Sequence, residues 1–124
     1  MSVEMVEDAV VDAGIQVIST VLYFPQGNDV EVIVRYPSLS SGTGSQSEFY
    51  YKQDRTFADT DPTTVTFAVP VVADPVNTGA TMSTFTIPGT DNKMAGAMWW
   101  RIDYVDPSNK RTTVGFGTLL VEAV

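Results

Sequence analysis

The spacing of apolar residues changes once along the chain, at Gly14. Before this glycine, Val3, Val6 and Val10 recur at the spacing of one helix face, and acidic residues occupy the early turns. A helix this short and this rich in valine is marginal unless it packs against something. We therefore interpret residues 1–14 as an N-terminal arm that orders against the domain or a neighbouring subunit; the alternative is a frayed terminus.

Beyond Gly14 the apolar positions alternate with a period of two, which predicts β-strands separated by turns rich in Gly, Pro and Asn. The first two predicted strands are joined by a short Pro-Gln-Gly-Asn turn, and we expect them to be adjacent. Pro70 has no backbone N–H to donate to a neighbouring strand, so it predicts an edge strand or the end of a strand. The seven predicted strands cover residues 15–23, 30–36, 48–53, 64–69, 81–87, 98–105 and 112–121.

Seven short strands without a strong helix among them predict an all-β fold, an immunoglobulin-like antiparallel β-sandwich over residues 15–124. Residues 1–14 would be its arm. The Ser/Gly-rich stretch 38–47 predicts a flexible loop that projects from one end of the sandwich.

The last two predicted strands form a hairpin around an Asp-Pro-Ser-Asn-Lys turn. Centring the hairpin on Ser108 places Trp100 opposite Phe116 on the core face. Trp99 then faces Gly117 on the outer surface, where a large ring would cover a glycine. Trp100 is predicted to be buried and Trp99 to point outward.

Composition supports a folded domain, because 44% of the residues are hydrophobic and only 18% are charged. The net charge is −8, and no Lys or Arg precedes Arg35, so the basic stripe of a nucleic-acid-binding protein is missing. The N-terminal sequence has neither the basic nor the long apolar region of a signal peptide. No apolar run has the roughly 18 residues of a membrane helix, so we expect no membrane partner.

The chain contains no histidine and no cysteine, which excludes Ser-His-Asp and Cys-His catalysis and His- or Cys-ligated zinc. No pair of opposed carboxylates is evident either, so we expect no catalytic residue, no metal and no cofactor. Asp54, Asp59 and Asp61 share one loop and could hold calcium, but they fit Asx turns better.

The candidate interaction residues are not expected to lie in the core of the sandwich; they are Val3, Val6, Val10, Trp99 and Arg101. An outward Trp beside an Arg is typical of interface hot spots. The alternative is that the arm or a loop of the same chain covers Trp99. Trp99, Tyr50 or Tyr51 could also form a stacking platform for a sugar.

Three segments form a recognisable series: the Gln-Gly-Asn-Asp turn at 26–29 with the strand Val30–Val34, the run Trp99–Lys110, and the closing strand Gly117–Val121. Through these residues the chain, from about Tyr23 to Val121, resembles the small immunoglobulin-like domains of tailed-bacteriophage virion proteins, which include capsid decoration proteins and the N-terminal domains of baseplate and fibre proteins. It departs from them in the Ser/Gly loop, which replaces an apolar segment common after the second strand, and in the added acidic arm.

This resemblance implies a non-enzymatic viral structural protein, made in the host cytoplasm and located in the virion. A capsid decoration or accessory protein is the leading hypothesis. It would dock in many copies, as a homo-oligomer, on other virion proteins such as the major capsid protein or tail proteins. The alternatives are a tail-tube or baseplate component and a carbohydrate-binding β-sandwich module.

Overall fold

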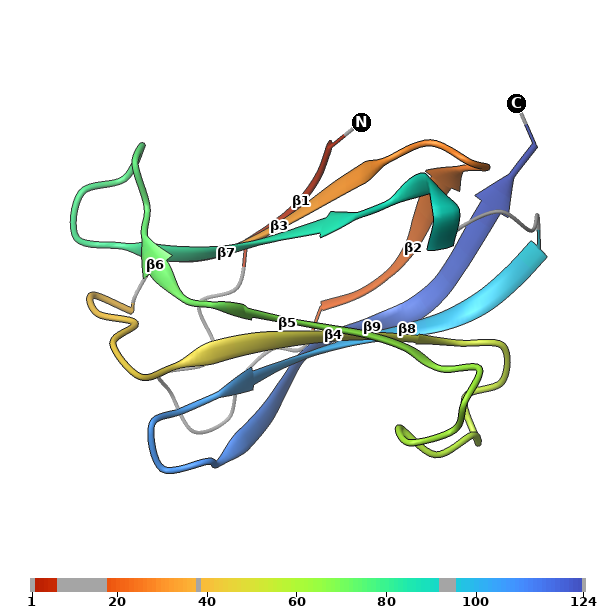
Figure 1. The fold of residues 1–124 in the computed structure, drawn as a ribbon. Coiled ribbons are helices and arrows are strands. Elements are labelled where there is room, and N and C mark those ends of the chain that lie inside the picture. Colours follow the sequence, from red (N-terminus) through yellow and green to blue (C-terminus); the bar gives the residue numbers. More distant parts are fainter. Residues whose placement is uncertain (1, 7–17, 38, 92–95, 124) are drawn as a thin grey trace.

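The computed structural model describes residues 2–6, 18–37, 39–91 and 96–123, which form two β-sheets packed face to face (Figure 1). The predicted all-β sandwich is confirmed. In spatial order, the four-stranded sheet contains β1 (Ser2–Val6), β3 (Val30–Tyr36), β7 (Thr81–Ile87) and β6 (Val72–Ala73). The five-stranded sheet contains β2 (Ile18–Pro25), β9 (Arg111–Glu122), β8 (Gly96–Val105), β4 (Gln46–Lys52) and β5 (Val65–Pro70). A 3-10 turn, η2, covers Gly89–Asp91.

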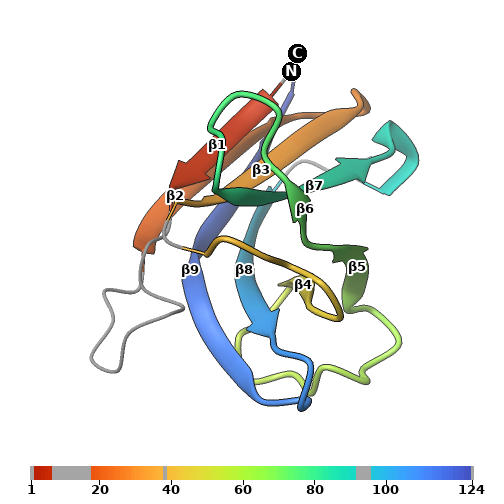
Figure 2. The ribbon, with the colours of Figure 1, turned by 90° about the vertical axis from the view of Figure 1, so that its left-hand side faces the viewer.

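All seven predicted strands are present, but two strand pairs are parallel: β1 with β3, and β2 with β9. The sandwich is therefore mixed rather than purely antiparallel. The expected pairing of the first two predicted strands is wrong, because β2 and β3 belong to different sheets (Figure 2). The Gln26 N–H donates to the Glu122 carbonyl at 2.7 Å, so β2 stays on β9 up to the turn. Gly27, with φ of 76°, lies in the turn that leads to the other sheet.

The helical spacing of the N-terminal valines does not lead to a helix over residues 2–6, which form the edge strand β1 along β3. Valine-rich alternation suits a strand, and the free edge of β3 supplies backbone partners that a marginal short helix lacks. Residues 7–14 of the predicted arm, Val10 among them, lie outside the described residues.

Pro70 ends β5, which is an edge strand, as predicted. The chain then passes through Val71 into β6 of the other sheet. The Ser/Gly-rich loop crosses between the sheets at the same end and packs there: the Ser45 hydroxyl lies 2.9 Å from the Tyr104 hydroxyl, and a Cβ at Gly42 would lie 2.5 Å from the Val71 carbonyl oxygen. This end of the sandwich is closed by loop packing.

The core contains aromatic rings from both sheets. Phe49 of β4 lies with its ring centroid 6.3 Å from that of Trp100 on β8 and 5.6 Å from that of Phe85 on β7. Trp100 is 2% exposed, which confirms its predicted burial. A chain of buried hydroxyls also joins the sheets, because Ser47 Oγ on β4 lies 2.7 Å from both Tyr36 Oη on β3 and Ser83 Oγ on β7.

The β8–β9 hairpin has the predicted register only near its turn. Val105 pairs with Arg111, which centres the turn on Ser108 as expected, and Asn109 has φ of 66°. A bulge beyond Asp103 then shifts the ladder by one residue, so Trp100 pairs with Gly117 rather than with Phe116. Phe116 consequently faces outward, where 44% of it is exposed, and the predicted stacking of Trp99 on Gly117 is wrong.

Candidate functional site

The outer face of the five-stranded sheet divides into two parts of different chemistry. Strand β2, the first half of β8 and Phe116 of β9 present apolar side chains to solvent, whereas β4, the second half of β8 and Arg111 at the start of β9 present charged ones. We call the first part the apolar half; it consists of Val21, Tyr23, Trp99 and Phe116. We call the second part the charged half; it consists of Glu48, Tyr50, Lys52, Arg101, Asp103 and Arg111.

The apolar half spans three neighbouring strands around Thr118. Val21 and Trp99 are both paired with Thr118, one from each side. On the same face, Tyr23 follows Val21 by two residues and Phe116 precedes Thr118 by two residues. Their exposed fractions are 43% for Val21, 50% for Tyr23, 36% for Trp99 and 44% for Phe116. Seven large apolar residues are exposed in the described part of the chain, and four of them gather here. Single exposed apolar residues are ordinary, whereas a contiguous group marks an interaction surface.

In the charged half, the charges satisfy one another. Arg111 donates to both oxygens of Glu48, at 2.7 and 3.1 Å, and Tyr50 Oη donates to the same carboxylate at 2.5 Å. Arg101 Nε donates to Asp103 at 3.1 Å, and Arg111 also lies 3.7 Å from this carboxylate. Glu48 and Asp103, opposite each other on β4 and β8, are therefore bridged by arginines. The sequence analysis did not anticipate this carboxylate pair.

Hydrogen bonds from Arg111 lower the pKa of the Glu48 carboxyl below its usual value, although burial opposes the shift. Burial raises the pKa of the Tyr50 hydroxyl, and its bond to Glu48 adds to the shift. Glu48 is thus ionised and Tyr50 is protonated at neutral pH. A carboxylate held ionised in this way is a poor general acid.

The loop after β4 covers one side of the charged half. Asp59 lies 2.6 Å from Lys52 Nζ and 2.8 Å from Arg101 Nη2, and the Arg101 bond lowers the pKa of this carboxyl. Asp54 and Asp61 instead accept hydrogen bonds from the backbone N–H two residues later, at 2.9 and 2.8 Å. These two residues make the predicted Asx turns. No group of three acidic side chains suited to a metal occurs in the described ranges, so calcium has no support from this loop.

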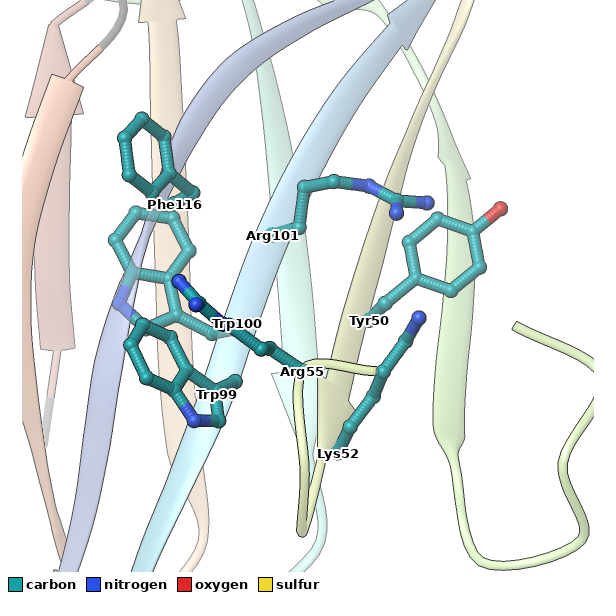
Figure 3. Close-up of a pocket in the computed structure, with 7 residues that line it drawn as sticks. All are labelled: Tyr50, Lys52, Arg55, Trp99, Trp100, Arg101 and Phe116. Carbon is teal, nitrogen blue, oxygen red and sulfur yellow. The ribbon is translucent and has the colours of Figure 1, made fainter. Parts of the chain in front are cut away.

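An open pocket of about 170 Å³ lies where the two halves meet (Figure 3). The Arg55 guanidinium, from the loop, lies over the Trp99 indole with Cζ 5.4 Å from the ring centroid. The Arg101 guanidinium lies over the Tyr50 ring at 4.5 Å. The lining residues are Tyr50, Lys52, Arg55, Trp99, Trp100, Arg101 and Phe116.

The structure places Trp99 and Arg101 together at this pocket, and Trp99 is exposed as predicted. Val3 and Val6 belong to β1 in the other sheet, so their strand is not part of this site, and Val10 lies outside the described residues.

Besides the charged pair Glu48 and Asp103, four residues at the apolar half and the pocket were not predicted from the sequence: Val21, Tyr23, Phe116 and Arg55. Val21 and Tyr23 alternate with buried Leu22 and Phe24, which is a detectable signal. The sequence does not show, however, that the face opposite Leu22 is uncovered. Phe116 was predicted on the core face, because the predicted register did not include the bulge in β9. Arg55 reaches the pocket only because its loop folds back over β4, and no local pattern predicts this.

No protein-family model matches the chain, and no curated protein matches it. Among solved structures, one described as PbICP-C in complex with falcipain-2 resembles it with a TM-score of 0.48 and 12% sequence identity. The alignment covers 99% of this chain and 98% of that one. No helix in the described ranges is long and apolar enough to cross a membrane.

Proposed function

We propose that the chain is a non-enzymatic structural protein of a tailed-phage virion, which docks in many copies on another virion protein through the apolar half. The observation that carries the docking is that Val21, Tyr23, Trp99 and Phe116 are all exposed on one face of three neighbouring strands. Interface cores combine aromatic anchors with a polar rim, and the charged half supplies such a rim on one side. The virion assignment rests on the resemblance of residues 23–121 to phage domains.

Within this class we favour a capsid decoration or accessory protein, with the major capsid protein as its partner. A lattice of identical subunits offers one docking site per repeat, and a small single-domain sandwich with an apolar group of side chains on one sheet suits such a site. A tail-tube or baseplate position is the alternative in the same virion class.

The state of the carboxylates favours contact over catalysis. Glu48 and Asp103 are nearly buried and are bound by arginines, and Asp59 is shared by two cations. The bonds to these cations lower the pKa of the Glu48 and Asp59 carboxyls, so neither group is poised to exchange a proton near neutral pH. Together with the lack of His and Cys in the sequence, this supports a binding role.

Sugar stacking is less well supported. Tyr51 is 1% exposed and belongs to the core, and Tyr50 is 6% exposed beneath Arg101. Trp99 is exposed, but Arg55 lies over its ring. A stacking platform needs an open aromatic face, so of the three candidates only Trp99 could contribute, and only after Arg55 moves.

The experiment is to purify particles of the virus whose genome encodes this chain and to quantify their proteins by mass spectrometry. We expect the chain in a fixed ratio to the major capsid protein. A fixed ratio to tail proteins at low copy number would favour the tail alternative. Its absence from intact particles, with abundant chain in the infected-cell lysate, would contradict a virion role.

A further inference from the structure

The pocket between the two halves has a charge opposite to that of the whole protein. The chain carries a net charge of −8, yet three of the seven residues that line the pocket are cations and none is acidic. The other four are aromatic. A surface of this composition complements an anion that is joined to an apolar group.

The three cations are not equivalent. Lys52 and Arg101 share the carboxylate of Asp59, so their charges are already balanced in part. Arg55 is exposed and makes no salt bridge in the described part of the chain, although its charge acts on neighbouring Asp54. Its guanidinium lies over Trp99, with Cζ 5.4 Å from the ring centroid (Figure 3). An arginine can contact an aromatic ring and still donate N–H groups to an acceptor.

We infer that this pocket binds a carboxylate of an acidic segment in the partner protein, with Arg55 as the donor. The apolar side chain next to this carboxylate in the partner would contact Trp99 and Phe116, which border the same pocket. The inference rests on the proposed docking function and names the chemistry that the partner must present.

A single carboxylate fits better than a phosphate. Lys52 and Arg101 already form salt bridges with Asp59. A dianionic group in the pocket would therefore pair with one cation that has no salt bridge, Arg55, rather than with three. The half-apolar lining favours a peptide side chain over a free ion.

The test uses NMR of the ¹⁵N-labelled full chain, whose two tryptophans give two indole N–H signals. The probes are the peptide acetyl-Ala-Glu-Phe-Glu-Ala-amide and its counterpart with Gln in place of both Glu. We expect the acidic peptide to shift the Trp99 indole signal while that of buried Trp100 moves little, and the Gln peptide to bind more weakly. Arg55→Gln should weaken the acidic peptide about two- to fivefold, the range of an exposed ion pair.

The matched control is Lys110→Gln, which removes the same charge from an exposed residue outside the pocket and should leave binding unchanged. Equal binding of the two peptides, or equal effects of the two variants, would overturn the inference. A dimer that the acidic peptide dissociates would overturn the assignment to a different protein, because the occupant would then be a second copy. Particle composition is measured separately, so a failure here and a failure of the virion role can be told apart.

Discussion

Trp99 and Trp100 are adjacent in the sequence but lie on opposite faces of β8, with exposed fractions of 36% and 2%. Trp100 packs against Phe49 in the core, whereas Trp99 contacts Arg55 at the surface pocket. One tryptophan therefore contributes to stability, and we propose that the other contributes to docking.

Substitution of the two tryptophans should separate these roles. Trp100→Ala removes a buried ring and should lower the free energy of unfolding by about 3–5 kcal/mol. Trp99→Ala should lower it by less than about 1 kcal/mol, because Trp99 lies outside the core cluster and its interaction with Arg55 is an exposed cation–π contact. Urea denaturation of both variants measures the difference. Equal losses would show that Trp99 is a core residue.

Removal of the two buried hydroxyls of β7, those of Thr81 and Ser83, should change the stability of the protein by different amounts. Thr81 Oγ1 is buried and has no hydrogen-bond partner among the described residues, so Thr81→Val should leave the free energy of unfolding unchanged or raise it by up to about 1 kcal/mol. Ser83→Ala is the control on the same strand, since Ser83 Oγ lies 2.7 Å from Ser47 Oγ and donates to the Pro70 carbonyl at 3.3 Å. Ser83→Ala should lower the free energy of unfolding by about 1–3 kcal/mol. Chemical denaturation that ranks the two the other way round would refute the hydroxyl network.

Glu48 should make stability depend on pH in the acid range. Arg111 lowers the pKa of Glu48 in the folded protein below the ordinary value of 4.5. The resulting stabilisation is present above pH 4.5 and is lost as the pH falls through the lower, folded-state pKa. Glu48→Gln should therefore be less stable than the wild type at pH 7. As the pH falls from 5 to below the folded-state pKa of Glu48, the free energy of unfolding of the variant should decrease less than that of the wild type.

Exposed Glu122 provides the matched control for this titration, because Glu122→Gln removes the same group from the end of β9. Its unfolding free energy should follow the wild-type pH profile. If Glu48→Gln also follows that profile, the ion pair with Arg111 contributes nothing to stability.

Seven of the nine strands in the described ranges could be predicted, because each contributes alternate residues to a core; β1 and the two-residue β6 were not predicted. Burial alternates strictly along β3, for example, from Val30 to Tyr36. Strand order could not be predicted in the same way. Whether β2 pairs with β3 or with β9 depends on long-range backbone contacts, and the short turn at Gly27 permits either.

The hairpin shows how a single residue limits such predictions. The Asp-Pro turn fixes its centre, but the bulge near Val114 reverses the faces of every later position on β9. Val114 is buried, and the bulge also places Gly115 and Gly117 on the buried face. The exposed position of Phe116 follows from that packing, and strict alternation cannot reveal it.

Docking through the apolar half is tested most directly by serine substitutions at exposed valines. Val21 lies in the apolar half, whereas Val76, which is 74% exposed, lies in the loop between β6 and β7. The measurement is co-sedimentation of each purified variant with particles that lack the chain. We predict that Val21→Ser combined with Phe116→Ser reduces bound protein about tenfold at an unchanged melting temperature, and that Val76→Ser binds like the wild type. Equal binding of the folded double variant and the Val76→Ser control would contradict docking through this face.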